Sequence, residues 1–194
     1  MSLPHALLTA LLERPGSGSE LASRFDRSIG HFWPATHQQI YRELARLEQA
    51  GWVESLPPQG GRGRKRAYRV LPAGRAELRR WTRETRMPRP MRVDLMVQLR
   101  AEAAIGPTGL LNNIEQLLQM HSEKLALYRR IEARDFQDTG PSREKALQHL
   151  VLHGGIMWES MWVEFCEQAV KTLSELDQPA TKPRKGRKSK MGPP

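Results

Sequence analysis

The longest amphipathic pattern in this 194-residue chain covers residues 142–176, and it constrains the fold more than any other feature. Apolar residues and one glycine recur there every three or four positions, which approximates the heptad seam of packed helices; they are Leu147, Val151, Gly154, Trp158, Met161, Phe165, Ala169 and Leu173. A helix of about 35 residues is about 50 Å long. Because this exceeds the width of a small domain, we expect a homodimer through the C-terminal helices, with a purely intramolecular helical pair as the alternative.

The first 86 residues contain a different pattern. Periodicity predicts helices over residues 2–13, 19–29 and 36–50, strands over 52–56 and 65–71, and a helix over 73–86. Thr36 followed by Gln39 fits a capping box for the third helix, whose apolar face is Ile40, Leu44 and Leu47. Three helices, a hairpin and a fourth helix is the order of a winged helix-turn-helix.

A proline-rich stretch around residues 87–90 predicts a domain boundary, because closely spaced prolines stop helices. Beyond it we expect helices over residues 92–104, 108–134 and 142–176. The predicted fold class is mainly α (α+β): a winged helix-turn-helix domain at 1–86, a helical dimerisation domain at 87–177, and a tail at 178–194. The tail contains six basic residues and no acidic ones, so we expect it to be disordered.

Charge and composition narrow the function classes. The chain has 31 Lys+Arg against 21 Asp+Glu, a net charge of +10, which favours a polyanionic partner. No apolar run approaches the ~20 residues of a membrane span, and the N-terminus lacks a secretory-signal pattern, so we expect a cytoplasmic protein without membrane contact. The single cysteine excludes an internal disulfide. We find no catalytic or cofactor-binding motif, and expect neither an enzyme nor a cofactor.

Double-stranded DNA is the partner that best fits the basic hairpin loop and the third helix. The loop contains glycines and four residues suited to phosphate contacts, namely Arg62, Arg64, Lys65 and Arg66. On the third helix, Gln38 or Gln39 would pair with adenine and Arg42 with guanine. His37 and Tyr41 suit phosphates, although the spacing of Tyr41 from Leu44 also allows it to pack under the helix.

Several spaced residues resemble the PadR family of transcriptional regulators. The matching segments are Gly30-His31-Phe32-Trp33-Pro34-Ala35, Ile40-Tyr41-x-x-Leu44-x-x-Leu47-Glu48-x-x-Gly51, Val53-Glu54, and Lys65-Arg66-x-Tyr68-Arg69 followed by Ala73-Gly74. The C-terminal half is similar to the virulence-activator type of helical tail in that family. The resemblance covers about residues 1–176 and implies a dimeric repressor, often released from a palindromic operator by a small molecule. This chain departs from the family pattern at Gly18-Ser19 and Leu71-Pro72.

Other residue groups have two interpretations each. Met157, Trp158, Met161, Trp162 and Phe165 would form either a packed dimer core or a pocket for a small aromatic effector. His149 and His153 have a spacing that suits a metal ion, but no third ligand is evident and we favour ordinary interface histidines. The competing functions are a non-specific architectural DNA-binding protein driven by the basic wing and tail, and an adaptor that binds another protein.

Overall fold

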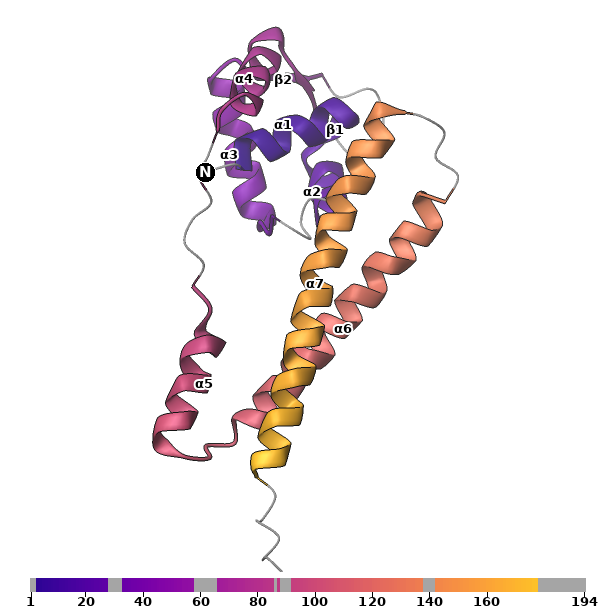
Figure 1. Cartoon of the computed structure of the whole chain (residues 1–194). Helices are drawn as coiled ribbons and strands as arrows, with labels where there is room; N and C mark the ends of the chain where they lie inside the picture. The colour runs from indigo at the N-terminus through magenta and orange to yellow at the C-terminus, as the bar shows by residue number, and fades with distance from the viewer. Residues whose placement is uncertain are drawn as a thin grey trace, which may run out of the picture. The chain divides into compact units, whose positions relative to one another are not determined.

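The computed structural model describes residues 3–27, 33–57, 66–85, 87, 92–137 and 142–177. Contacts divide the chain into two units, residues 1–89 and 90–194 (Figure 1). The first unit contains α1 (Leu3–Glu13), β1 (Gly16–Ser17), α2 (Gly18–Arg27), α3 (His37–Gln49), β2 (Val53–Leu56), β3 (Ala67–Val70) and α4 (Pro72–Thr82). The second contains α5 (Asp94–Ile105), α6 (Leu110–Asp135) and α7 (Arg143–Leu176).

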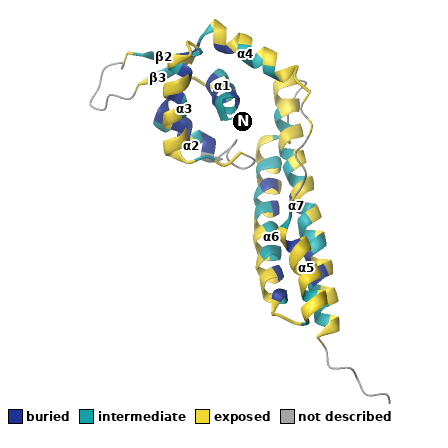
Figure 2. Ribbon diagram, turned by 90° about the vertical axis from the view of Figure 1, so that its left-hand side faces the viewer, coloured by how far each residue is buried: buried dark blue, intermediate teal, exposed yellow. Residues whose placement is uncertain are grey.

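The core of the first unit lies between α1, α2 and α3 and the base of the hairpin. Figure 2 shows buried positions on each of these helices. Twelve buried side chains form one cluster, namely Leu7, Leu8, Ala10, Leu11, Leu21, Ala22, Phe25, Ile40, Leu44, Leu47, Val53 and Val70. The predicted inward face of α3 is therefore confirmed. Its burial on one side leaves the opposite side of α3 exposed.

The sheet has three antiparallel strands in the order β1-β3-β2. β2 pairs with β3 from Val53 opposite Val70 to Leu56 opposite Ala67, which confirms the expected hairpin. β1 is not predictable from the sequence, because a two-residue strand has no periodicity and its Pro-Gly-Ser context is typical of a break. Gly16 pairs with Tyr68 and Ser17 with Ala67, so the turn between α1 and α2 is attached to the central strand.

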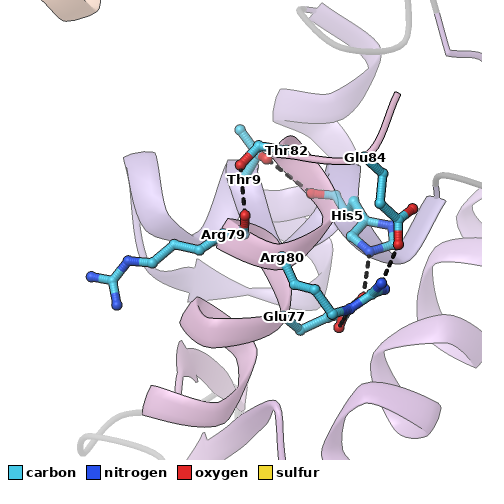
Figure 3. Close-up of polar contacts among 7 residues, drawn as sticks. All are labelled: His5, Thr9, Glu77, Arg79, Arg80, Thr82 and Glu84. Carbon is cyan, nitrogen blue, oxygen red and sulfur yellow. Dashed lines mark hydrogen bonds and ion pairs between the residues drawn. The ribbon is translucent and has the colours of Figure 1, made fainter. Parts of the chain in front are cut away.

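A polar cluster joins α1 to α4 (Figure 3). The buried His5 ring stacks on Trp81 with 4.5 Å between ring centroids. Its Nε2 lies 3.0 Å from a Glu77 carboxylate oxygen, and Arg80 donates from Nε to the other oxygen at 2.7 Å. Arg80 also contacts Glu84. The hydrogen bonds from Arg80 and His5 lower the pKa of Glu77 to about 2.

This cluster predicts an acid-sensitive contribution to stability. Glu77 has a pKa of about 2 in the fold against 4.5 ordinarily, so its contribution is present above about pH 4.5 and is lost as the pH falls through about 2. Hydrogen bonds to a carboxylate on a partly exposed surface suggest a loss on the order of 1 kcal/mol. We expect Glu77→Gln to be less stable than the wild type at pH 6 but to lose less stability between pH 5 and 2. Urea unfolding across that range measures this, and parallel pH curves for the two proteins would contradict it.

The second unit is a helical assembly in which α6 packs along α7. Its buried cluster is Leu95, Leu110, Ile114, Cys166 and Ala169, with Trp162 and Phe165 packed against it. Cys166 is fully buried, as expected for a small apolar residue, and burial raises the pKa of its thiol. Within the described residues, no helix is both long enough and apolar enough to cross a bilayer.

The other helix boundaries agree with the predicted ones within a few residues, except at α4. This helix ends at Thr82, four residues before the predicted end at 86, where Thr82 donates its hydroxyl to the Arg79 carbonyl. Arg62, Arg64 and Lys65 of the predicted wing, and the tail at 178–194, lie outside the described residues.

Candidate nucleic-acid interface

The exposed side of α3 carries all the DNA-contact candidates predicted on this helix. Ile40, Leu44 and Leu47 are buried, while His37, Gln38, Gln39, Tyr41 and Arg42 are exposed. No ion pair involves Arg42 among the residues that the structure describes, whereas Arg46 pairs with Glu43 at 3.2 Å. A guanidinium without a counter-ion on an exposed helix face has all its donors available for an acceptor such as a guanine edge.

The capping box at the start of α3 involves Gln39 and not Gln38. The Thr36 hydroxyl accepts from the Gln39 backbone N–H at 3.2 Å, and the Thr36 N–H donates to Gln39 Oε1 at 2.9 Å. Pairing with adenine requires both the oxygen and the nitrogen of a glutamine amide. Because the Gln39 oxygen already accepts in the cap, Gln38 is the better candidate for reading an adenine.

Tyr41 packs across the start of α2. A Cβ atom added to Gly18 would lie 2.5 Å from Tyr41 Cε1, so the tyrosine ring occupies the space above this glycine. The Tyr41 side chain is still 46% exposed. Tyr41 therefore packs against α2, and contact of its exposed part with a phosphate stays a prediction. Its position next to Gly18-Ser19 coincides with a departure from the PadR pattern.

The hairpin carries one further candidate, Tyr68, which is not among the predicted DNA contacts. Tyr68 on β3 is partly buried beside the exposed Arg66. Burial raises the pKa of its phenol and the Glu48 carboxylate raises it further, so Tyr68 is a neutral hydroxyl at physiological pH. Glu48 also accepts from the Ser55 N–H at 3.0 Å, which attaches α3 to β2. The sequence signal was the position of Tyr68 between two arginines next to the glycine-rich loop.

A second feature of interest is an apolar stripe on α7 that lies away from α6. We define the α7 stripe as Leu147, Leu150, Val151, Gly154, Met157, Trp158 and Met161. The six apolar side chains of the stripe are 45–64% exposed. Leu150 was missed in the predicted seam, although it precedes Met157 by seven residues. A Cβ atom at Gly154 would meet nothing within 4 Å.

On the side of α7 that faces α6, the side chains are packed against or paired with residues of α6. A Cβ at Gly155 would lie 3.0 Å from the Tyr128 ring, and Trp162 stacks on His121 at 5.3 Å. Glu159, only 2% exposed, contacts His121 Nδ1 at 2.5 Å and Lys124 Nζ at 2.9 Å. Burial opposes the charge on Lys124, but the hydrogen bond and charge of Glu159 outweigh it and raise the Lys124 pKa. The first half of α7 is thus apolar on a side that α6 does not cover.

The five residues predicted as a dimer core or effector pocket are divided between these two sides. Trp162 and Phe165 pack against the buried cluster of the unit, whereas Met157, Trp158 and Met161 are exposed. A pocket lined by all five would require other atoms to cover the exposed three.

His149 interacts with neighbours other than a metal ion. Its Nε2 lies 2.7 Å from Glu132 Oε1, and its ring stacks on Phe136. His153 meets His149 edge to face. No group of three His, Cys, Asp or Glu residues in the described parts of the chain has the geometry to hold a metal ion.

Each of the two units matches the profile of a known protein family. The profile of the transcriptional regulator PadR-like family matches residues 7–80, and that of the virulence activator alpha C-terminal region matches residues 91–174. A probable transcriptional regulator of Mycobacterium tuberculosis is 41% identical over 187 residues, which cover 90% of this chain and 99% of that protein. This chain belongs to the PadR-like family of transcriptional regulators.

Solved structures of two other proteins have the same fold as this chain. The virulence activator AphA of Vibrio cholerae matches with a TM-score of 0.77 and 26% identity over 90% of this chain and 99% of that one. Bacillus subtilis PadR in complex with operator DNA matches with a TM-score of 0.76 and 23% identity, over 89% and 99% of the two chains. The same Bacillus protein in complex with p-coumaric acid matches with a TM-score of 0.74 and 22% identity, over 90% of this chain and 99% of that one. The predicted fold class, a winged helix-turn-helix followed by a helical domain, is therefore confirmed for this PadR-like regulator.

Proposed function

We propose that this PadR-like regulator is a homodimeric repressor that recognises a palindromic operator with α3 of each subunit. The observation that carries the proposal is the division of α3 into a buried apolar face and an exposed face with Gln38, Tyr41 and Arg42. A helix in the major groove presents such side chains to base edges, while the wing contacts the backbone or the minor groove. A relative with the same fold, Bacillus subtilis PadR, is known in complex with operator DNA.

Two identical reading helices would match two half-sites related by a two-fold axis, about 34 Å or one helical turn apart. The α7 stripe supports the dimer, because six large apolar side chains on one surface are unusual for a monomer in water. Gly154 lies within the stripe and would permit close approach of a second helix. A second copy seated on the stripe would bury the side chains that α6 leaves exposed.

The experiment that tests operator recognition is selection of bound fragments from random-sequence duplexes, followed by affinity measurements on the enriched site. We expect a palindrome to be enriched. Arg42→Ala should weaken binding to the enriched site by about 10- to 100-fold, equivalent to 1–3 kcal/mol, and relax the preference at one base pair of each half-site. Because Arg46 is paired with Glu43, Arg46→Ala is a matched control on the same helix and should change the base preference little.

The main alternative is an architectural protein that binds DNA without sequence preference through its basic wing and tail. This alternative predicts that no site is enriched and that deletion of residues 178–194 removes most of the affinity. The repressor proposal predicts that the deletion weakens binding but leaves the enriched site unchanged, because non-specific phosphate contacts carry no sequence information.

We also propose that a small aromatic effector releases the protein from its operator, at a pocket that Met157, Trp158, Met161, Trp162 and Phe165 line once a second subunit covers α7. The p-coumaric acid complex of Bacillus subtilis PadR supports an aromatic ligand. Adding phenolic acids to the protein–operator complex tests this. Release by wild type, with release lost in Trp158→Ala, is the expected result, whereas equal release from both proteins would place the ligand elsewhere.

A further inference from the structure

The surface of α4 carries a row of arginines that neither the fold nor the reading helix explains. Arg75, Arg79 and Arg83 are exposed and are spaced four residues apart, so they lie on one face of α4 and the residue that ends it. We call them the α4 arginine row. This face is turned away from α1, since α4 packs inward through the buried Gly74 and through Glu77 and Trp81, which contact His5. In Figure 3 the Arg79 side chain extends away from the His5–Glu77 cluster.

The neighbouring arginine on the same helix is arranged differently. Arg80 is neutralised by Glu77 and Glu84, which raises its pKa. Within the described residues, no ion pair involves Arg75, Arg79 or Arg83. Like charges four residues apart on one face of a helix repel each other. Among the described residues no carboxylate offsets this repulsion, and an anionic partner outside the chain would do so.

The surroundings of the row favour phosphate over protein as that partner. A protein interface generally needs a core of large apolar or aromatic side chains. The exposed neighbours on α4 are small or polar, namely Pro72, Ala73, Ala76 and Thr82, and no large apolar side chain of α4 is exposed. A phosphate backbone requires only charge and hydrogen-bond donors, which arginine supplies in a planar fork.

The row also begins near the base of the hairpin. Leu71 alone separates β3 from α4, and the Leu71 N–H donates to the Trp52 carbonyl at 2.9 Å. Gly74 packs directly on that carbonyl, so the first turn of α4 is held at the base of the hairpin. From Arg75 to Arg83 the helix rises about 12 Å, which matches three to four phosphates of one strand measured along the duplex axis.

We propose that the α4 arginine row is a second phosphate-binding surface, which contacts the backbone of duplex DNA outside the segment read by α3. The inference rests on the part of the proposed function that says the protein binds DNA. It does not require that the protein recognises an operator. The row adds affinity without sequence preference.

The test uses the full chain and a random-sequence duplex of 40 base pairs, with affinity measured from low to moderate salt. Each phosphate contact contributes about 0.9 to the slope of log affinity against log salt concentration. We expect the triple variant Arg75→Gln/Arg79→Gln/Arg83→Gln to lower this slope by two to three, and the triple Arg→Lys variant to retain most of it. Arg79→Gln should lower the slope by about one, whereas the adjacent Arg80→Gln, which removes the same charge, should barely change it.

Melting temperatures of the variants distinguish a loss of DNA binding from a loss of folding. The triple Gln variant removes like-charge repulsion, so its melting temperature should equal or exceed that of the wild type while its DNA affinity falls. An unchanged salt slope in the triple variant would overturn the inference. Equal decreases in slope for Arg79→Gln and Arg80→Gln would also overturn it, because they would show that the net charge of the protein, and not contact by the row, sets the slope. Absence of any enriched sequence in the selection experiment would refute the repressor proposal alone, since the slope on random DNA does not depend on it.

Discussion

The double variant Met157→Asp/Met161→Asp is expected to be a monomer and to lose at least 100-fold in affinity for a palindromic site. Both side chains lie on the α7 stripe, 62% and 45% exposed. In a dimer through this stripe, the two aspartates of each chain would be buried without partners, and burial of unpaired charges costs several kcal/mol. A monomer reads only one half-site and loses the gain of about 10²–10⁴ that linked binding provides.

The protomer itself should tolerate this double substitution, since neither methionine belongs to the buried cluster of the unit. Helix content and protomer fold should therefore be retained. Gln168→Asp/Lys171→Asn is the matched control, because it changes the charge by the same amount at exposed positions further along α7. Sedimentation equilibrium gives the mass and fluorescence anisotropy the affinity. A dimeric mass for the methionine variant at micromolar concentration would refute an interface through the α7 stripe.

Gly74→Ala is expected to destabilise the first unit by about 2–3 kcal/mol, a large effect for the addition of one methyl group. The new Cβ would lie 2.4 Å from the Trp52 carbonyl oxygen and 3.0 Å from Val70 Cγ1. The Trp52 carbonyl oxygen belongs to the backbone directly before β2 and cannot rotate away as a flexible side chain can, so α4 would have to move from the base of the hairpin. That movement would disrupt the hydrogen bond from the Leu71 N–H to the same carbonyl.

Ala76→Ser is the control for Gly74→Ala, because it adds one heavy atom at an exposed position of the same helix. We expect it to change stability by less than about 0.5 kcal/mol. For a unit of this size, 2–3 kcal/mol corresponds to a decrease in melting temperature of roughly 10–20 °C. Urea and thermal unfolding followed by circular dichroism measure both variants. Equal stabilities for the alanine and serine variants would show that α4 adjusts freely at Gly74.

The candidate site was partly predictable because α3 is specified by local chemistry. Its apolar residues recur with the helical period, and Thr36 and Gln39 form the cap that their spacing predicts. The same periodicity identifies which side chains of α3 remain exposed. It does not distinguish Gln38 from Gln39 as a base reader, although both are exposed. That distinction depends on the orientation of one amide oxygen toward Thr36.

The helices, the hairpin, the inward face of α3 and the surplus of positive charge are predictable from the sequence, because they depend on composition and on neighbours a few residues apart. Three features follow only from the packing of the elements: Tyr41 packs over Gly18, α6 covers one side of α7 and leaves the α7 stripe exposed, and Arg80 has ion-pair partners whereas Arg79 has none among the described residues. These features join residues from different elements or depend on how a side chain is turned. Periodicity along one segment contains no information about which side of a helix a distant segment will cover.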